Sequence, residues 1–183
     1  AGGGVNGVCG LRFKYHIGGI PYDHKYIWSN LGYNLKPIEI QAAMGRVQLT
    51  KVDGFIEKRK HNFQQLQTFF ANYERFFILP KATRHSDPSW FAYPITIRDN
   101  APFDRFTMTQ YLESKNNQTR PLFAGNITRQ PILKHIAYKV KGTLINSDRI
   151  FLNTFFVGVY PGLTDKHIDY MTSVFQQFFK KYA

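Results

Sequence analysis

Two short stretches of the sequence contain polar side chains that are suited to binding an anion. Asn34 places an amide donor just ahead of a predicted helix start, where backbone N–H groups without partners also attract an anion. Arg120, in TRPLFAGN, carries a guanidinium group that can hold a diphosphate by forked, charge-assisted hydrogen bonds, and Asn126 ends the same stretch. By residue type alone, the favoured interpretations are a turn or capping Asn and a surface Arg beside a turn Asn.

The cysteine and histidine residues do not form a recognisable metal motif. Cys9 is the single cysteine, which excludes an intramolecular disulfide framework and makes a free thiol the simplest interpretation. His24, His61 and His135 lack the spacing of metal ligands. The scarcity of cysteine agrees with a reducing, cytoplasmic setting, which we therefore expect.

The composition indicates a folded, basic chain. Its 183 residues are 43% hydrophobic and 16% aromatic, which is enough apolar material for a core, and no run approaches the roughly 18 apolar residues of a membrane span. The net charge of +12 permits a nucleic-acid partner, but the basic residues are spread along the chain and the densest group, 57–61, lies on a predicted helix. We therefore expect neither a nucleic-acid nor a membrane partner. The same positive potential also suits a smaller anionic ligand.

Apolar periodicity predicts the elements that must position these side chains. Residues 1–36 are rich in Gly and turn formers, and the glycine-rich beginning reads as a loop with more chain ahead of it. Pro37 precedes a predicted helix that ends at Leu49. After a break near 50–53, a second helix is predicted over about Val52 to Tyr73.

Aromatic side chains dominate the apolar positions. We expect Phe63, Phe69 and Phe70, on the second helix, to pack against a domain outside this chain, which would make the isolated chain prone to self-association. Trp90 and Phe91 could stack on a ligand ring, but a place in the core of a strand is the favoured interpretation.

After Pro80 the pattern predicts a small α+β arrangement. In chain order, the predicted elements are a strand over Trp90–Ile97, a helix from the N-cap Asp104 to Lys115, strands over Thr119–Phe123 and Arg149–Val159, and a helix from the cap Thr164 to Tyr182. Pro94 favours an edge or irregular position in its strand. The last helix should bury Ile168, Met171, Val174, Phe175, Phe178 and Phe179.

Several motifs of this sequence resemble a known family. The segment that crosses between the large and small domains in the DegT/DnrJ/EryC1/StrS sugar aminotransferase family is similar to GYNLKPIEIQAAMGRVQL followed by FIEKRKHNF. The dehydrating branch of that family, the CDP-4-keto-6-deoxyglucose 3-dehydrases of lipopolysaccharide biosynthesis, is similar to CGLRF, YDHKYIWSNLGYNLK, DPSWFAYPITI, TRPLFAGNITRQP, NSDRI and VGVYPGLTDKHIDY. The resemblance runs from about Cys9 to the C-terminus.

The resemblance implies an α/β fold, namely the C-terminal part of a fold type I pyridoxal-phosphate transferase. In that fold, residues 1–36 would be the loop-rich end of the large cofactor domain, residues 37–75 the linking helices, and residues 76–183 the small C-terminal α+β domain. Such enzymes are normally homodimers with the active site at the subunit interface.

The resemblance also implies an activity and a set of binding residues. The activity is loss of the C3 hydroxyl as water from a CDP-4-keto-6-deoxyhexose, with pyridoxamine phosphate or pyridoxal phosphate as cofactor, on the route to the 3,6-dideoxyhexoses of O-antigens. Asn34 would contact the cofactor phosphate of the partner subunit, and Arg120 and Asn126 would contact the nucleotide-sugar substrate. Weaker substrate-binding candidates are Arg129, Lys134 and Tyr160.

The catalytic base of this branch, a histidine, does not match any histidine of this sequence, so no catalytic residue is assigned. We therefore expect the chain by itself to be inactive.

The branch also carries a [2Fe-2S] cluster, whose last cysteine ligand matches Cys9, while the preceding ligand would fall at Ala1. Either position 1 departs from the natural residue or the cluster is lost. An iron-sulfur flavin reductase would be the electron-donating partner.

Three alternatives to the dehydrase remain open at this stage. The chain could come from a pyridoxal-phosphate-dependent sugar-nucleotide aminotransferase, which would use a lysine where the dehydrase has its histidine. It could be a basic, non-catalytic binding module. It could also be a degenerate relative with only a structural role, which Ala1 in place of a cysteine would favour.

Overall fold

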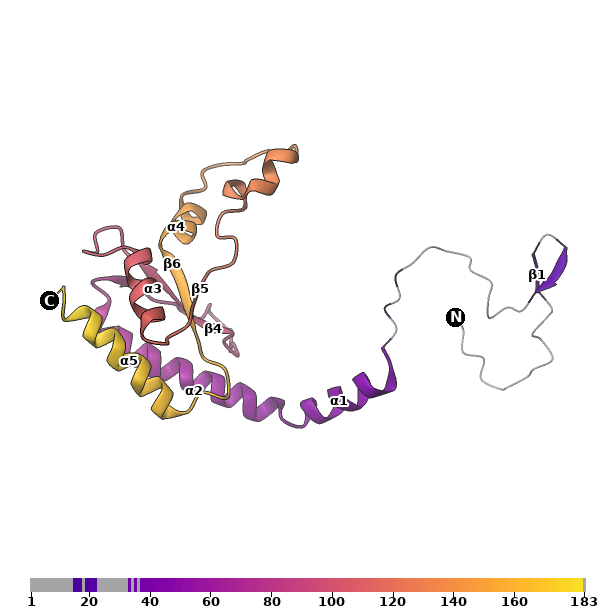
Figure 1. Ribbon diagram of the computed structural model, residues 1–183, viewed down its shortest axis with the longest axis horizontal. Coiled ribbons are helices and arrows are strands. Elements are labelled where there is room, and N and C mark those ends of the chain that lie inside the picture. Colours follow the sequence, from indigo (N-terminus) through magenta and orange to yellow (C-terminus); the bar gives the residue numbers. More distant parts are fainter. Residues whose placement is uncertain (1–14, 18, 23–32, 34, 36, 183) are drawn as a thin grey trace. The chain divides into compact units, whose positions relative to one another are not determined.

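The computed structural model describes residues 15–17, 19–22, 33, 35 and 37–182, and the chain divides into two compact units, residues 1–45 and 46–183 (Figure 1). In the first unit, the antiparallel strands β1 (Tyr15–Ile17) and β2 (Ile20–Tyr22) form a short hairpin. The helix α1 (Glu39–Leu49) has no buried residue and is followed by a turn at Thr50, within the break predicted near 50–53.

The second unit contains a four-stranded antiparallel sheet in the order β3-β4-β6-β5. Its helices and strands, in chain order, are α2 (Val52–Phe70), β3 (Phe77–Ile78), β4 (Ala92–Ile97), α3 (Arg105–Ser114), β5 (Thr119–Pro121), α4 (Ile145–Asn153), β6 (Thr154–Gly158) and α5 (Asp165–Phe179). Three short 3-10 turns lie between them: η3 (Ala71–Tyr73), η4 (Ile127–Arg129) and η5 (Pro131–His135). This is the α+β arrangement that the pattern predicted.

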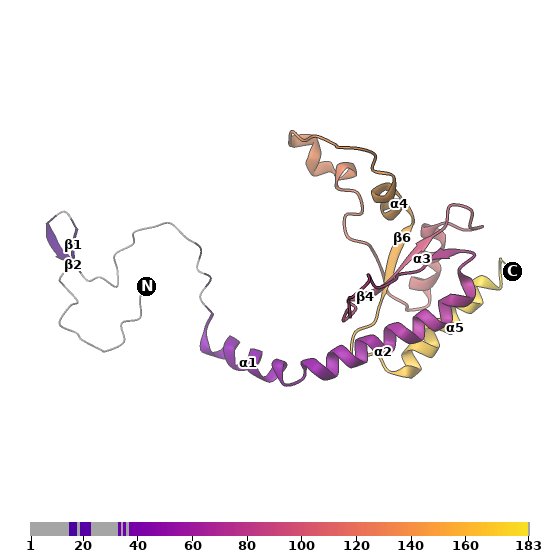
Figure 2. The same cartoon turned by 180° about the vertical axis from the view of Figure 1, so that it is seen from behind.

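The two faces of the sheet are chemically different because side chains alternate along each strand. On one face, Tyr93 and Val157 lie opposite each other and are buried, and α2 and α5 run side by side over the sheet (Figures 1 and 2). On the other face, Phe156 lies between Pro94 of β4 and Arg120 of β5. We call this second side the open face, because Arg120 is exposed and Pro94 and Phe156 are only partly buried.

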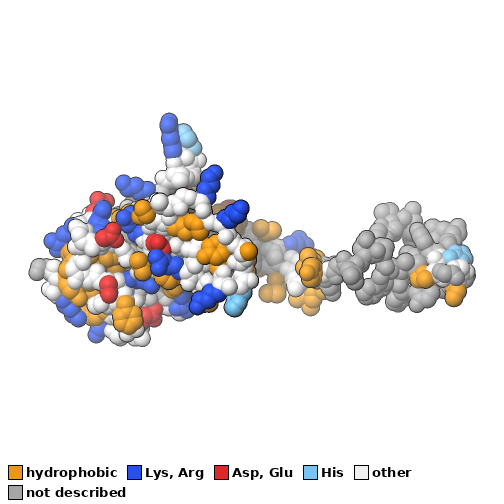
Figure 3. All heavy atoms as spheres, turned by 90° about the horizontal axis from the view of Figure 1, so that it is seen from above, with side chains coloured by type: hydrophobic (Ala, Val, Ile, Leu, Met, Phe, Trp, Pro, Cys, Tyr) orange, Lys and Arg blue, Asp and Glu red, His pale blue; other side chains and the backbone are white. Residues whose placement is uncertain are grey.

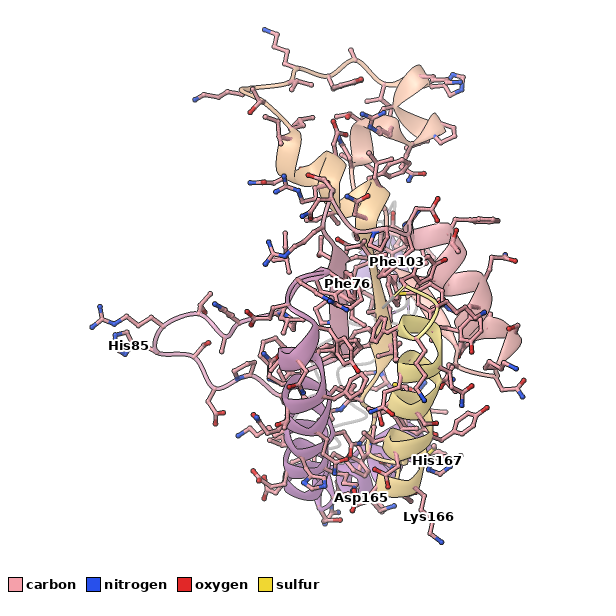
Figure 4. The ribbon with its side chains drawn as sticks, turned by 90° about the vertical axis from the view of Figure 1, so that its left-hand side faces the viewer. Phe76, His85, Phe103, Asp165, Lys166 and His167 are labelled. Carbon is pink, nitrogen blue, oxygen red and sulfur yellow. The ribbon has the colours of Figure 1, made fainter. Side chains whose placement is uncertain are left out.

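The core between the sheet and its helices is largely aromatic. Phe70 stacks on Tyr93 at a ring-centroid distance of 5.3 Å and meets Phe175 edge-on at 4.9 Å. Figure 4 shows Phe76 and Phe103 near one end of α5, where their centroids are 5.3 Å apart. All the positions predicted to be buried on the last helix are buried: Ile168, Met171, Val174, Phe175, Phe178 and Phe179.

The expectation that the aromatic side of α2 packs outside this chain is wrong. Phe63 and Phe70 are buried within the second unit, and Phe69 packs against the same core. The reason is the amphipathic α5, whose phenylalanines supply the surface that α2 needs.

A buried asparagine ties α2 to the turn that follows β6. The Asn62 side chain is fully buried, and its Nδ2 donates to the carbonyl oxygens of Val159, Tyr160 and Leu163 at 3.2–3.3 Å. Its Oδ1 has no partner among the described atoms. A buried donor that serves three carbonyls of one turn fixes the path of that turn against the helix.

A second polar contact joins α2 to the beginning of α5. Asp165, labelled in Figure 4 at the start of α5, accepts hydrogen bonds on Oδ1 from Lys58 at 3.2 Å, and from His61 and Gln65 at 3.0 Å. These bonds lower the pKa of Asp165 to about 2, and the bond from Gln65 contributes most to this lowering. Thr164 and His167 form a capping box around the same helix start, as the cap prediction required.

The strand predicted over Arg149–Val159 is wrong in its first half. Residues up to Asn153 belong to α4, and only Thr154–Gly158 form β6. Arg149 and Asn153, four residues apart and therefore on one side of a helix, both donate to the carboxylate of Asp99, at 3.3 and 2.8 Å. The helix begins before Arg149, so a pattern that starts at Arg149 misses it.

The strand prediction around Pro94 needs two corrections. Strand β4 is internal rather than an edge, but β3 reaches only to Thr96, so Pro94 has a strand partner on the β6 side alone. The strand begins at Ala92, and Phe91 is 66% exposed rather than part of the core. Trp90 does pack against the core, stacked on Phe63 at 4.0 Å.

Substitution of Asn62 tests the tie between α2 and the turn after β6. Asn62→Ala should lower the free energy of unfolding by about 1–3 kcal/mol, because it leaves buried carbonyl groups without a donor. Gln64→Ala, at an exposed position of the same helix, should change it by no more than about 0.5 kcal/mol. Urea unfolding followed by far-UV circular dichroism measures both, and equal effects would contradict the assignment.

Asp165 should make the stability of the chain depend on pH at the acid end. Its pKa is lowered in the folded state, so its contribution is present above the ordinary value of 3.8 and is lost as the pH falls towards about 2. The stability of the unsubstituted chain should therefore fall more steeply over this range than that of Asp165→Asn. Thermal unfolding at a series of pH values measures the two slopes, and parallel slopes would refute the prediction.

Candidate functional site

The stretch after β5 is a tight turn with two residues in the left-handed region. Phe123 has φ +49° and its N–H donates to Pro121 O at 2.7 Å, while Gly125 has φ +63° and donates to Leu122 O at 3.0 Å. A Cβ at position 125 would lie 2.6 Å from Phe151 Cα, so only glycine fits. The turn is thus held closely against α4.

Asn126, the last residue of this turn, is buried and has hydrogen bonds on both sides of its amide. Its Oδ1 accepts from the backbone N–H of Thr128 at 3.0 Å and from the Thr128 hydroxyl at 2.7 Å, which caps η4. Its Nδ2 donates to Asp148 Oδ1 at 2.7 Å. In this structure the Asn126 side chain therefore organises the loop.

Arg129 meets the same carboxylate. Its Nε donates to Asp148 Oδ1 at 2.6 Å, and its guanidinium group lies 5.8 Å from the centroid of the Phe151 ring. The hydrogen bond from Arg129, followed by that from Asn126, lowers the pKa of Asp148 to about 2 and keeps it charged at neutral pH. Asp148 thus joins α4 to the loop through two predicted site residues.

Asp148 was missed by sequence reasoning, although its motif, NSDRI, was noted. An acidic residue in the first turn of a helix is a detectable signal, since it complements the helix dipole. The signal was hidden because the residues directly after Asp148, from Arg149 on, were interpreted as a strand. Once the segment is a helix, Asp148 faces the loop that carries Asn126 and Arg129.

The other predicted substrate residues lie apart from this pair. Arg120 is exposed on β5, where its Nη1 donates to Thr119 O at 3.0 Å and its nearest neighbour across the sheet is Phe156. Tyr160, 55% exposed, follows β6, beyond the end of the strand opposite to α4. Lys134 is exposed on η5. The structure brings Asn126 and Arg129 together and leaves Arg120 and Tyr160 separate.

Tyr160 is held in place by its own turn. A Cβ on Gly162 would lie 2.5 Å from the Tyr160 ring, so a residue larger than glycine would push the ring aside. The Tyr160 carbonyl accepts from Asn62 at 3.2 Å. In the YPGLT turn, a buried amide therefore holds the backbone of Tyr160, and the Tyr160 ring lies directly against Gly162.

Beside Arg120, the open face carries a group of phenylalanines that sequence reasoning did not identify as a site. Phe91, Phe123 and Phe156 have mutual ring-centroid distances of 5.8–6.3 Å, and Phe91 and Phe123 are 66% and 75% exposed. A pocket of about 200 Å³ adjoins Phe123 and is also lined by Arg105, Gly125 and Phe151. A positive charge next to an apolar, aromatic surface can hold an anion that carries a ring.

Two predicted site residues, Asn34 and Cys9, lie outside the described residues. Their predicted contacts with a cofactor phosphate and an iron-sulfur cluster stay predictions. Among the residues that the structure describes, no group of three His, Cys, Asp or Glu side chains could hold a metal ion. In the same residues, no helix is both long enough and apolar enough to cross a bilayer.

The charges on the second unit follow the distribution expected from the sequence. Figure 3 shows Lys and Arg side chains scattered over the visible face of this unit, with few Asp and Glu side chains between them. Part of the dense basic run is engaged in contacts, since Lys58 and Lys60 pair with Asp165 and Asp87. This is the pattern of a solvated helix face.

The chain matches one protein family over most of its length. The DegT/DnrJ/EryC1/StrS aminotransferase family matches residues 12–176. The lipopolysaccharide biosynthesis protein RfbH of Salmonella typhimurium is 46% identical over 178 residues, which are 96% of this chain and 41% of that protein. The dTDP-4-dehydro-2,6-dideoxy-D-glucose 3-dehydratase of Saccharopolyspora spinosa is 45% identical over 180 residues, which are 97% of this chain and 39% of that protein.

The fold also matches a solved enzyme. The Escherichia coli GDP-4-keto-6-deoxy-D-mannose-3-dehydratase with bound hydrated pyridoxal phosphate superposes with a TM-score of 0.73 at 26% identity, over 82% of this chain and 38% of that chain. The predicted fold class, an α/β fold type I pyridoxal-phosphate enzyme, is confirmed, as is the predicted family resemblance. The chain spans about two fifths of the length of the curated relatives it matches.

Two glycine substitutions separate backbone strain from crowding in the LFAGN turn. Gly125→Ala and Gly142→Ala both force alanine into the left-handed region, which costs about 1–2 kcal/mol. Only position 125 adds a clash with Phe151, worth about a further 1–3 kcal/mol, because nothing lies within 4 Å of a Cβ at position 142. Equal losses of stability in thermal unfolding would show that the turn is not packed on α4.

Proposed function

The chain belongs to the DegT/DnrJ/EryC1/StrS aminotransferase family, and we propose that it is the C-terminal part of a pyridoxamine-phosphate-dependent sugar-nucleotide 3-dehydratase. The observation that carries this proposal is the similarity of nearly the whole chain to a protein named as a sugar-nucleotide 3-dehydratase. The proposed substrate is a CDP-4-keto-6-deoxyhexose on the route to the 3,6-dideoxyhexoses of O-antigens. The similarity to a lipopolysaccharide biosynthesis protein supports that route.

The described residues offer a phosphate-bearing ligand a basic and aromatic surface on the open face. Asn34 is proposed to donate its amide to the cofactor phosphate across a homodimer interface. When bound, the cofactor supplies an amine for the keto sugar and an electron sink for loss of the C3 hydroxyl as water. The residues described here bind and orient the substrate, while the catalytic base belongs to a part of the enzyme that does not match this chain.

Within this proposal the substrate-binding residues have different tasks. Arg120 holds the diphosphate of the nucleotide sugar, since it is an exposed residue of β5 and belongs to the row of residues on the open face. Asn126 and Arg129 are proposed to border the sugar while their bonds to Asp148 keep the loop in place. Tyr160 is proposed as a further substrate contact from the turn after β6.

The remaining assignments concern the whole enzyme. We propose a cytoplasmic homodimer, with the active site completed across the subunit interface. Where a cluster is present, Cys9 is its last ligand in this chain, and an iron-sulfur flavin reductase delivers the electrons. A second candidate, a sugar-nucleotide aminotransferase, is favoured only by the breadth of the family.

The test uses the natural polypeptide that carries these 183 residues. Purified protein mixed with pyridoxamine phosphate and a CDP-4-keto-6-deoxyhexose should yield a 3-deoxy sugar nucleotide that is lighter by one oxygen atom, detected by mass spectrometry. The two electrons for this replacement of the C3 hydroxyl by hydrogen come from the cofactor amine, which leaves pyridoxal phosphate and ammonia, or from the reductase where one is supplied. An aminotransferase would instead place nitrogen on the sugar. Arg120→Ala should raise KM for the sugar nucleotide by roughly tenfold, as expected for a lost charge-assisted contact of about 1.5 kcal/mol.

Arg84→Ala, at an exposed position before β4, is the matched control for Arg120→Ala and should keep the KM of the unsubstituted protein. A folded protein that shows no absorbance band with pyridoxal or pyridoxamine phosphate would refute the proposed function. Transfer of an amino group to the sugar would replace it with the aminotransferase.

A further inference from the structure

Phe91, Phe123 and Phe156 form one exposed aromatic surface although they come from three distant parts of the sequence. Phe91 precedes β4, Phe123 follows β5, and Phe156 lies in β6 between those strands. The Phe91 and Phe123 rings are inclined by 29° with centroids 6.3 Å apart, and Phe156 lies 5.8 and 6.1 Å from them. We call these three rings the aromatic platform.

The backbone of two platform residues, Phe123 and Phe91, is held in a defined conformation although their rings are exposed. Phe123 is a bulky residue at φ +49°, a strained conformation for a residue other than glycine, yet its ring is 75% exposed and gains little from burial. Arg59 donates to the carbonyl oxygens of Trp90 and Phe91, both at 3.1 Å, and so fixes the backbone that carries Phe91. Strain and dedicated hydrogen bonds at exposed rings indicate a surface that receives a ligand.

Two arginines lie beside the platform. Arg120 is the cross-strand neighbour of Phe156 on the same face, so their Cβ atoms lie about 5 Å apart. Arg105 lines the pocket of about 200 Å³ next to Phe123, and the residues that line this pocket include no carboxylate. A planar aromatic ring attached to a diphosphate is complementary to this combination of rings and guanidinium groups.

We propose that the aromatic platform is the nucleobase subsite of the enzyme: the base of a nucleoside diphosphate stacks on Phe123 and Phe91, and its diphosphate is held by Arg120. This rests on the proposed function in taking a nucleotide sugar as the ligand, and it adds the residues that contact the base. Stacking is tolerant of base identity because every base has an aromatic face, so the platform supplies affinity for the nucleotide rather than selection among bases.

The experiment measures binding of CDP and of inorganic pyrophosphate to the natural polypeptide by isothermal titration calorimetry. Phe123→Gly removes the ring and also relieves the left-handed strain, so it should fold at least as well as the unsubstituted protein. It should weaken CDP binding by about 5- to 100-fold, the range for loss of one stacked base, and leave pyrophosphate binding unchanged. Arg120→Ala should weaken the binding of both ligands.

One further test variant and two controls complete the set. Phe91→Ala, also at an exposed ring, should weaken CDP binding without affecting pyrophosphate. Phe106→Ala removes a ring that is 70% exposed on α3, outside the platform, and should bind both ligands as the unsubstituted protein does. Phe123→Tyr keeps an aromatic ring and should retain most of the affinity for CDP.

Unchanged CDP affinity in Phe123→Gly and Phe91→Ala would overturn the proposal. If these variants instead change the oligomeric state in sedimentation velocity, with CDP affinity retained, the surface is covered by protein and the proposal also fails. Failure of the proposed function is seen separately, as a missing cofactor absorbance band in the unsubstituted protein. The unsubstituted protein could show a normal cofactor band and dehydrate the sugar while the variants bind CDP with unaltered affinity. In that case only the proposed nucleobase subsite is wrong.

Discussion

The register of β4, β6 and β5 is the constraint on which the rest of the second unit depends. It places Tyr93, Val157 and Thr119 in one row on the buried face and Pro94, Phe156 and Arg120 in the next row on the open face. A slip of one residue would exchange the two faces, burying Arg120 and exposing Val157. The aromatic core under α2 and α5 prevents this, because it accepts only the apolar row.

The two turns that carry the family motifs are each held by one polar side chain from a distant element. Asp148 of α4 holds the LFAGN turn through Asn126 and Arg129. Asn62 of α2 holds the YPGLT turn through three backbone carbonyls. The motifs NSDRI and KHNF, which supply these side chains, are therefore partners of the turns in space. The geometry of the open face depends on both pairs.

Much of the fold followed from local rules, and much of the site did not. The caps Asp104 and Thr164 and the buried side of α5 could be predicted because capping and periodicity are local. The strand proposed over Arg149–Val159 failed because the helical contacts of its first half involve Asp99, far away in the sequence. Phe91 was assigned to the core because hydrophobicity alone does not tell which face of a sheet is covered. The role of Asp148 could be recognised only once its segment was known to be a helix.

The inferred role of the open face of this sheet is to receive the nucleotide of a sugar-nucleotide substrate. A crystal structure of the natural polypeptide with CDP and its cofactor tests this most directly. We expect the base to be stacked on the Phe123 ring, at about 3.5–4 Å as is typical of packed carbon atoms, with the diphosphate in hydrogen-bond contact with the Arg120 guanidinium group. Nucleotide bound elsewhere, or an open face filled by protein side chains, would contradict it.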